Sequence, residues 1–387
     1  MRVLIIHNVL WAHYKSLVFE ELFKISQKDE NFKLLVVQIA VTERSRVSMG
    51  SLDRSTIAYP YELIQDGILE EVPLKKRITG MLSAIQRFKP DVVNITGYYD
   101  LAFWVVLFYC KLNGIKTILS NESTAGDHQR KGFKEKLKAF FVRQFDGFFN
   151  FGTLSAKYMT ELGARPHQLL VNKNCVDNQS IRSIYKNAYL NREQSQINQN
   201  LHQHNFIFVG RLIPFKNLPV LMEAFQEALA QTKARNWGLI LLGDGEQKVE
   251  LEKIVSENGF KQITFLPSVG WKEVPTYLAL ADVLVLPSYS EPWGLVVNEA
   301  MACGMPVIVS ERCGCAPDLV QNQRNGIIIN PYSGKELANA LASFMDGSYS
   351  IHDMGRVSEK IIEEYTPQIV AKEMYEGFKR SSQAKGK

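Results

Sequence analysis

The amino-acid sequence predicts an α/β protein with two domains, each built on a parallel β-sheet. The chain has 387 residues, too many for one ordinary core and suited to two domains of roughly 150 to 200 residues. Residues 282–287 form a short apolar run without polar alternation, which is typical of a strand buried on both faces of a sheet. A helical pattern follows over 295–303, then Gly304 and Pro306 as stop signals, and a new strand at 307–310. In such βαβ units, ligands bind at the carboxyl ends of the strands.

Composition narrows the class of protein. Forty-five Lys and Arg against 40 Asp and Glu give a mild formal charge of +5, which predicts no nucleic-acid partner. No apolar run reaches the 18 residues that a membrane span needs, and the opening MRVLIIHNVL has the pattern of a strand rather than of a cleavable signal. We therefore expect a cytoplasmic protein. The five cysteines lack a disulfide or zinc spacing and fit a reducing compartment, so no metal is expected; they are Cys110, Cys175, Cys303, Cys313 and Cys315.

Strand and helix patterns alternate through the first domain, which we expect to span residues 1–177. The apolar segment 101–112 is too short to cross a bilayer and is interpreted as a buried helix that ends at Asn113-Gly114. Strands are expected at 2–8, 34–41, 91–95, 116–119, 146–152 and 168–172, and other helices at 15–26, 78–88, 129–143 and 155–162.

The predicted helix 129–143 has a basic face. Its apolar residues recur at helical spacing, so one side is expected to pack on the sheet and the other to face solvent. Docking of the basic face on anionic lipid is the alternative. The basic residues are Arg130, Lys131, Lys134, Lys136, Lys138 and Arg143, and the apolar ones are Phe133, Leu137, Phe140 and Phe141.

A polar stretch rich in Asn and Gln, residues 178–204, is expected to be a linker. The second domain is expected over 205–360 and opens with a strand at 205–209. A helix is predicted at 218–230, with Asn217 as its cap. Further strands are expected at 238–242, 262–266 and 326–329. A long terminal helix is expected from Glu359 to Lys379, and residues 361–387 are assigned to the terminal helical segment.

Two motifs of the second domain carry the chemistry. Arg211 and Lys216 follow the strand at 205–209, where a guanidinium fork and a mobile ammonium suit phosphate. Glu291 and Glu299 flank the turn that opens the helix at 295–303. The first amides of that helix, from Gly294 to Val296, are expected to bind a phosphate. Carboxylates beside an anion site suggest a ligand that also offers hydroxyl groups, such as a sugar or a ribose.

These motifs resemble those of the retaining glycosyltransferases of family 4. Glu291 and Glu299 match the family's E-x7-E signature within EPWGLVVNEA, and Gly210, Arg211 and Lys216 match its G-R-x4-K pattern. Gly243 and Gly245 are similar to a G-x-G turn of the family. The segment KNCVD at 173–177 is similar to its Asn-Gly-Val-Asp segment, with Cys175 in place of glycine.

The resemblance implies the GT-B architecture, in which two Rossmann-like domains face each other across a cleft. The domain at 1–177 would bind the acceptor, the domain at 205–360 would bind a nucleotide sugar, and the segment 361–387 would pack back on the first domain after a break at Thr366-Pro367.

The implied activity is sugar transfer from a nucleoside diphosphate sugar to a hydroxyl of a glycan or lipid-linked acceptor, as in polysaccharide biosynthesis, with retention of configuration and without metal or other cofactor. Catalysis would involve Glu291, Arg211 and Lys216. Donor binding would involve Gly210, Gly243, Gly245, Pro292, Trp293, Gly294, Leu295, Val296 and Glu299.

The first domain departs from the family pattern at two places. The loop HNVLWAHYKS lacks the family's paired glycines, which leaves His13 and Tyr14 as candidate acceptor contacts. Glu122 stands about where the family often has a histidine, with His128 six residues on. We predict that all four belong to a cleft or acceptor site.

Alternatives to a transferase remain open at this level. A sugar-nucleotide epimerase of GT-B fold would turn over the donor alone, and a catalytically silent subunit would bind the nucleotide sugar without transfer or hydrolysis. A phosphorylase would need a lysine-bound pyridoxal phosphate, for which the sequence gives no signal. Contact with the inner face of the membrane, through helix 129–143, is a further expectation.

Overall fold

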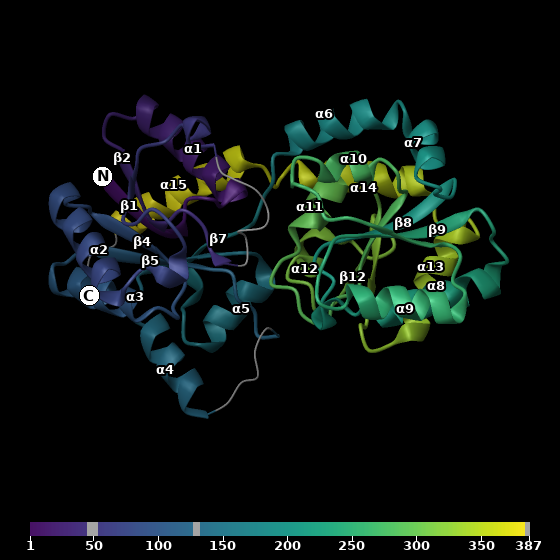
Figure 1. Ribbon diagram of the computed structural model, residues 1–387. Coiled ribbons are helices and arrows are strands. Elements are labelled where there is room, and N and C mark those ends of the chain that lie inside the picture. Colours follow the sequence, from purple (N-terminus) through teal and green to yellow (C-terminus); the bar gives the residue numbers. More distant parts are fainter. Residues whose placement is uncertain (45–52, 127–131, 384–387) are drawn as a thin grey trace. The chain divides into compact units, whose positions relative to one another are not determined.

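The computed structural model describes residues 1–44, 53–126 and 132–383 (Figure 1). The chain divides into two compact units. Unit 1 comprises Met1–Cys175 together with Pro367–Lys387, and unit 2 comprises Val176–Thr366. Each unit is a Rossmann-like α/β structure with a parallel sheet, as the sequence predicts.

Unit 1 is built on a seven-stranded sheet with the order β3-β2-β1-β4-β5-β6-β7. The strand pairs are parallel, and the order changes direction between β1 and β4. The strands are β1 (Arg2–Val9), β2 (Lys33–Ala40), β3 (Tyr61–Leu63), β4 (Val92–Thr96), β5 (Lys116–Asn121), β6 (Gly147–Asn150) and β7 (Leu169–Asn172).

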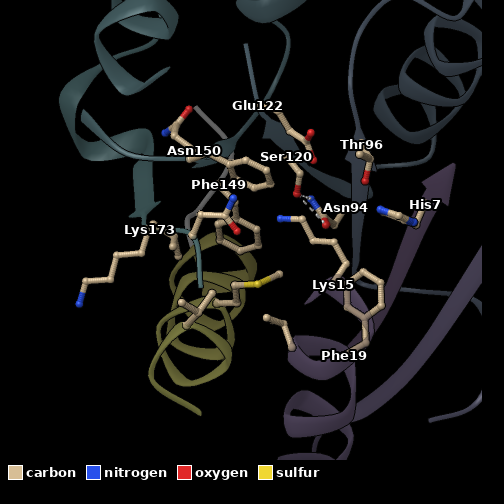
Figure 2. A pocket seen from close by; sticks show the side chains of 16 residues that line it. His7, Lys15, Phe19, Asn94, Thr96, Ser120, Glu122, Phe149, Asn150 and Lys173 are labelled. Atoms are coloured by element: carbon tan, nitrogen blue, oxygen red, sulfur yellow. Dashed lines mark hydrogen bonds between the residues drawn. The ribbon is translucent and has the colours of Figure 1, made fainter. Parts of the chain in front are cut away.

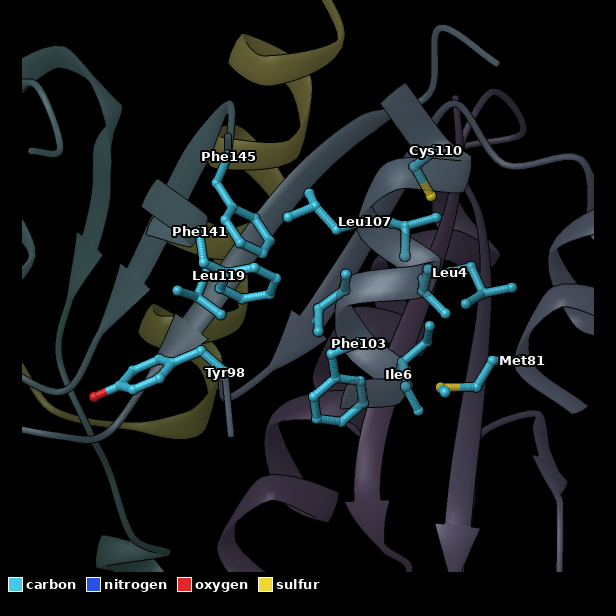
Figure 3. Close-up of a cluster of buried hydrophobic side chains, with 14 of the residues drawn as sticks. Leu4, Ile6, Met81, Tyr98, Phe103, Leu107, Cys110, Leu119, Phe141 and Phe145 are labelled. Atoms are coloured by element: carbon cyan, nitrogen blue, oxygen red, sulfur yellow. The ribbon is translucent and has the colours of Figure 1, made fainter. Parts of the chain in front are cut away.

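Helices cover both faces of this sheet. The strand β1 shows why, because Val3 and Ile5 pack into one hydrophobic cluster while Leu4 and Ile6 pack into another. The cluster around Leu4 is closed by aromatic and aliphatic side chains of the helices (Figure 3). The helices are α1 (His13–Lys28) and α15 (Pro367–Gln383) on one face, and α2 (Leu74–Phe88), α3 (Leu101–Leu112), α4 (Gly132–Val142) and α5 (Thr153–Glu161) on the other.

Unit 2 is built on a six-stranded parallel sheet with the order β10-β9-β8-β11-β12-β13. Near-continuous apolar runs form its central strands, whose residues are buried. The strands are β8 (His204–Val209), β9 (Trp237–Leu242), β10 (Ile263–Leu266), β11 (Val283–Leu286), β12 (Val307–Ser310) and β13 (Gly326–Ile329).

The helices of unit 2 also lie on both faces of its sheet (Figure 1). On one face α8 packs against α13, and on the other α11 packs against α6 and α14. The helices are α6 (Asn178–Tyr189), α7 (Arg192–Asn198), α8 (Leu218–Thr232), α9 (Lys248–Asn258), α10 (Val274–Leu278), α11 (Leu295–Ala302), α12 (Ala316–Leu319), α13 (Gly334–Met345) and α14 (Ile351–Ile362).

The segment 178–204 is not the polar linker that its composition suggests. It forms α6 and α7 within unit 2 and begins β8. Long-range contacts order it: Arg192 forms an ion pair with Asp282 (2.8 Å), and the Gln196 amide donates to the Leu280 carbonyl (2.9 Å). These partners lie more than 80 residues away in the sequence, so local composition does not reveal them.

The terminal helical pattern is divided in two. Helix α14 ends at Ile362 in unit 2, and α15 begins at Pro367 and packs on α1 and β7 in unit 1. Lys173 and Glu373 form an ion pair (2.7 Å) between β7's end and α15. The break at Thr366-Pro367 lies where proline favours the start of a new helix.

Candidate functional site

The two predicted motifs of unit 2 meet where the strand order of its sheet changes direction. Strands β8 and β11 are hydrogen-bonded neighbours although β9 and β10 separate them in sequence. The loop from Gly210 to Asn217 follows β8, and the loop from Pro287 to Gly294 follows β11. In parallel α/β sheets such a switch point opens a crevice at the carboxyl ends of the strands. The sheet topology therefore brings both loops to the position where ligands bind.

Lys216 and Glu291 form an ion pair between these loops. Their side chains are only 14% and 16% exposed. The backbone supports the pairing, because the Tyr289 amide donates to the Phe215 carbonyl (2.8 Å). Arg211 is exposed, and in the described part of the chain its guanidinium has no hydrogen-bond or ion-pair partner. The site thus holds one paired cation and one that is accessible to a ligand.

Asn217 fixes the loop that carries Lys216. It is buried with a left-handed backbone (φ 60°), and its side-chain amide donates to the carbonyls of Pro287 (3.2 Å) and Pro331 (2.8 Å). Asn217 is the N-cap residue of α8, as predicted, but its side chain makes no capping hydrogen bond to that helix. Its amide instead joins the loops after β8, β11 and β13.

Gly243 and Gly245 allow the loop after β9 to approach the loop after β8. Both have positive φ, and a Cβ on either would collide with a carbonyl oxygen, that of Gly210 or that of Leu212. The Leu212 amide donates to the Asp244 carbonyl (2.8 Å) across the same approach. Glycine is therefore required at both positions by the close packing of the two loops as well as by the turn. This packing keeps Gly210 and Arg211 in position.

The backbone of the Glu291 loop is clamped to a second loop at residues 313–315. The amide of Gly314 donates to the Glu291 carbonyl (2.8 Å), and the amide of Cys315 donates to the Trp293 carbonyl (3.1 Å). A Cβ on Gly314 would collide with the carbonyl oxygen of Pro292. Only glycine therefore allows this contact, which sets the position of Glu291.

Helix α11 begins immediately after this loop. Gly294 is its N-cap residue with φ 93°, so the chain turns sharply and the amides of Leu295 and Val296 form the first turn. Amides at this position lack intrahelical acceptors and attract anions. Trp293 has a different role from its neighbours, because its side chain is 3% exposed and its indole donates to the Asn298 side chain (2.8 Å). Trp293 anchors the loop, and Pro292 is exposed.

Glu299 lies farther along α11 and is buried at 6% exposure. Burial raises the pKa of the Cys303 thiol, and the neighbouring Glu299 carboxylate raises it further. Glu299 already has an interaction within the protein, so a ligand hydroxyl would be an additional partner for this buried carboxylate.

Exchange of Glu299 for glutamine keeps the size of the side chain and removes its charge. We expect Glu299→Gln to raise the KM for the donor several-fold with a smaller change in kcat, since glutamine keeps a neutral hydrogen bond of about 0.5–1.5 kcal/mol in place of the charged one of about 1.5–3 kcal/mol. Steady-state kinetics at varied donor concentration measure this. An unchanged donor KM would remove Glu299 from the donor site.

The cysteines near the site are not reactive groups. Burial raises the pKa of Cys313 and of Cys315, and the Glu291 carboxylate adds to both shifts. A thiol that resists ionisation is a poor nucleophile and a poor metal ligand. Among residues 1–44, 53–126 and 132–383, no group of His, Cys, Asp and Glu is arranged to hold a metal ion.

Unit 1 has a pocket at the carboxyl edge of its own sheet (Figure 2). Glu122, one of the predicted residues, lines it together with Lys15, Asn94 and Ser120. The other lining residues are His7, Val18, Phe19, Thr96, Phe149, Asn150, Phe151, Val171, Lys173, Asn174, Val370 and Met374. The pocket therefore combines amide, hydroxyl and charged groups with an apolar wall from α1 and α15.

Lys15 and Asn150 are the polar groups of this pocket that most need a ligand. The Lys15 ammonium lies 3.3 Å from the centroid of the Phe151 ring. Burial lowers the pKa of Lys15, an effect that the Glu122 carboxylate partly opposes. Asn150 is 1% exposed; its amide donates to Asn172 (3.0 Å), while its side-chain oxygen has no donor in the described part of the chain.

The lowered pKa of Lys15 makes unit 1 more stable at high pH. Between the lowered pKa and the ordinary value of 10.5, the unfolded chain binds the proton that the folded chain has lost, so the free energy of unfolding rises with pH across that window. We expect Lys15→Met to lack this rise. Denaturant unfolding at a series of pH values up to about 10.5 measures it; parallel curves for the two proteins would contradict the burial of the ammonium.

The other three residues predicted for the cleft or acceptor site do not all lie in the described part of the structure. Tyr14 lies in the first turn of α1 and is half-buried, but it does not line this pocket. His13 begins α1, and its side chain lies outside the described part of the structure, as does residue His128. Lys15, Asn94 and Asn150 also line the pocket and were not predicted from the sequence. Only Lys15 had a signal, since it follows the first strand and its loop.

The helices of the described chain differ in length and in apolar character. None of them is both long enough and apolar enough to cross a bilayer. The apolar helix α3 has 12 residues, which agrees with the length argument made from the sequence.

Part of the chain matches a known family. Residues 191–361 match the family described as "Glycosyl transferases group 1". This range lies within unit 2 and contains all the predicted catalytic and donor-binding residues.

Curated relatives align with less than half of the chain. A D-inositol 3-phosphate glycosyltransferase of Arthrobacter sp. (strain FB24) is 28% identical over 179 residues, which cover 46% of this chain and 42% of the relative. One from Pseudarthrobacter chlorophenolicus is 31% identical over 157 residues, 40% of this chain and 37% of the relative. The chain thus matches less than half the length of these relatives.

Solved structures are similar over almost the whole chain. Alr3699/HepE of Anabaena, in complex with UDP, has a TM-score of 0.75 at 17% identity and covers 98% of this chain and 100% of its own. Sucrose-phosphate synthase from Thermosynechococcus elongatus has a TM-score of 0.74 at 18% identity, with 100% of both chains covered. At such identities these similarities show the fold, two Rossmann-like parallel-sheet domains of the GT-B class.

Proposed function

We propose that this chain is a glycosyltransferase that uses a nucleoside diphosphate sugar, proceeding from the match of residues 191–361 to the group 1 glycosyl transferases. One observation carries the proposal. The Lys216–Glu291 ion pair lies at the switch point of the unit 2 sheet, beside the first turn of α11. This arrangement offers positive charge and amides to a diphosphate and a carboxylate to sugar hydroxyls.

In this proposal the diphosphate binds to cations and amides of unit 2. Arg211 is exposed and has the planar fork that suits phosphate oxygens. Lys216 shares its ammonium between Glu291 and the diphosphate, and the amides of Leu295 and Val296 provide further donors. Negative charge grows on the diphosphate as it leaves, so donors that are already in position stabilise the transition state.

The two carboxylates hold the hydroxyl groups of the donor. Glu291 accepts from the hydroxyls of the transferred sugar while its backbone is held by Gly314. Glu299 accepts from the ribose. Gly210, Gly243 and Gly245 keep the loops after β8 and β9 close enough to border the nucleotide.

Transfer is proposed to retain the configuration at the anomeric carbon. The acceptor hydroxyl attacks the face that the diphosphate leaves, the bond from the anomeric carbon to the diphosphate oxygen breaks, and that phosphate group takes the acceptor proton. No protein base and no metal are needed for this step. NMR of the product during the first turnovers tests the retention of configuration, and an inverted product would contradict it. Loss of activity with EDTA would contradict the metal-independent step.

The pocket of unit 1 is proposed to bind the acceptor. Its amide and hydroxyl groups fit the hydroxyls of a sugar, and the Asn150 oxygen requires a donor such as a hydroxyl group. Glu122 and Lys15 would contact polar groups of the same acceptor.

A panel of nucleotide sugars in a thermal-shift assay tests the donor class. UDP and UDP-glucose are the first probes, because Anabaena HepE was solved with each of them. A ligand at one hundred times its Kd adds about 2.7 kcal/mol of stability, and we expect one nucleotide diphosphate to do so. Turnover of the donor must then require an acceptor. Turnover to an epimer without acceptor, or tight binding without transfer or hydrolysis, would contradict the proposal.

A further inference from the structure

Helix α3 of unit 1 is apolar on both sides. Its inner side packs on the sheet through Ala102, Phe103, Val106, Leu107 and Cys110. Its outer side presents Leu101, Val105, Phe108 and Leu112, which recur every three or four residues and are all exposed, Leu101 at 65% and Leu112 at 88%. A helix on the surface of a globular protein normally has a polar outer side. The outer side of α3 is therefore built to be covered.

Helix α4 extends this apolar surface. Leu137 and Phe140 are exposed, and the Phe140 ring lies 6.4 Å from both Trp104 and Phe108 on α3. We name the six side chains Leu101, Val105, Phe108, Leu112, Leu137 and Phe140 the apolar face. Contiguous exposed apolar surface of this kind marks a contact with a partner or a membrane.

The charges around the apolar face are predominantly positive. Lys134 and Lys136 on α4 are exposed and have no ion pair among the described residues. Three acidic side chains of this region are already ion-paired: Glu135 with Lys138 (2.7 Å), Asp146 with Lys111 (3.3 Å) and Lys116 (3.7 Å), and Asp100 with Arg77. An apolar helix side bordered by lysines is complementary to an anionic lipid surface, in which acyl chains lie beneath phosphate groups.

We propose that α3 and α4 dock unit 1 on an anionic bilayer, with the apolar face at the boundary between headgroups and acyl chains. The docking itself does not require the transferase reaction. Interfacial binding needs only partial burial of apolar side chains, which agrees with a helix too short to span the membrane.

The position of the apolar face selects a class of acceptor, a consequence that rests on the proposed function. Leu101 lines a second hollow together with Tyr99 and Thr96, and Thr96 also lines the candidate acceptor pocket. This hollow thus shares one lining residue with the apolar face and one with that pocket. An acceptor whose glycan enters the pocket and whose lipid chain stays in the bilayer fits this arrangement.

Vesicle co-sedimentation tests the docking. We expect the full chain to bind vesicles of phosphatidylcholine with 30% phosphatidylglycerol, and to bind pure phosphatidylcholine at least tenfold less. The double variant Val105→Glu/Phe108→Glu should lose at least tenfold in partitioning. The double variant Lys134→Glu/Lys136→Glu should lose a similar factor in partitioning, because each basic side chain at an anionic surface contributes about fivefold. In high salt this second variant should partition as the unchanged protein does, whereas the first should still partition less.

Matched variants in unit 2 control for exposure and charge. Val249 is 78% exposed on α9 and Lys335 is exposed at the start of α13, so Val249→Glu and Lys335→Glu should bind vesicles as the unchanged protein does. Equal circular dichroism spectra and equal thermal unfolding curves without ligand verify that all variants fold. Quenching of Trp104 fluorescence by brominated lipid gives an independent readout of docking. This quenching should be absent in Trp104→Phe.

Two outcomes would overturn the docking proposal. The first is equal partitioning of unchanged protein and double variant. The second is concentration-dependent dimerisation that Val105→Glu/Phe108→Glu abolishes without any vesicle binding, which would identify the face as a contact between copies. Vesicle binding without activity on lipid-linked acceptors would refute only the acceptor class, and absence of all transfer would refute the proposed function while leaving the docking intact.

Discussion

Lys216→Ala is expected to lower kcat/KM for sugar transfer by about 10²- to 10³-fold, the usual effect of removing one electrostatic donor from an active site. The variant loses the cation that would neutralise the leaving diphosphate, and it leaves the Glu291 carboxylate, 16% exposed, without its ion-pair partner. Glu291→Ala should cause a loss of similar size, because the transferred sugar would lose its carboxylate contact. Steady-state kinetics with saturating acceptor provide the measurement.

The double variant tells whether the two residues act together. If Lys216 and Glu291 form one functional pair, the double variant should lose much less than the product of the two single losses. Arg192→Ala is the matched control, because Arg192 and Asp282 form an ion pair of comparable burial in the same unit, with side chains 13% and 11% exposed. It should reduce stability but keep kcat/KM within a few-fold. A full rate in Lys216→Ala would exclude the lysine from the reaction.

Gly314→Ala is expected to destabilise unit 2 by about 3 kcal/mol or more, because its Cβ would collide with the backbone carbonyl of Pro292 and the loops cannot separate without losing their hydrogen bonds. This corresponds to a fall in Tm of roughly 6–12 °C for a unit of this size. Calorimetry of the full chain measures the change. Donor affinity should fall as well, because the same clamp holds Glu291.

Gly334→Ala is the control for the glycine variant. It replaces another glycine of unit 2 whose added Cβ would meet only one side-chain atom of Val220 at 3.5 Å, an ordinary packing distance. Its Tm should change by a few degrees at most. Equal stability of the two variants would show that the loop at 313–315 yields easily and does not fix Glu291.

Much of the fold follows from local sequence patterns. The predicted strand at 282–287 and helix at 295–303 correspond to β11 and α11, because unbroken apolar runs and the Gly304 stop signal act over a few residues. The same patterns identified the Arg211–Lys216 and Glu291–Glu299 motifs, and the topology of unit 2 brings Lys216 against Glu291.

The errors and omissions come from contacts between distant residues. Polar composition suggested a linker at 178–204, but buried contacts to Leu280 and Asp282 form helices there. Asn217 occupies the predicted cap position, but its side chain binds loops that lie 70 and 114 residues further along the chain instead of the helix. The structural importance of Gly314 and of Asn150 follows only from which backbone or pocket lies beside them.

The structure of the chain bound to its preferred nucleoside diphosphate tests the central claim most directly. We expect the diphosphate within hydrogen-bonding distance of the Lys216 ammonium and of the Leu295 and Val296 amides, with the ribose hydroxyls at Glu299. A nucleotide bound elsewhere on unit 2, or one whose phosphates leave Arg211, Lys216 and the first turn of α11 without contact, would contradict the donor site.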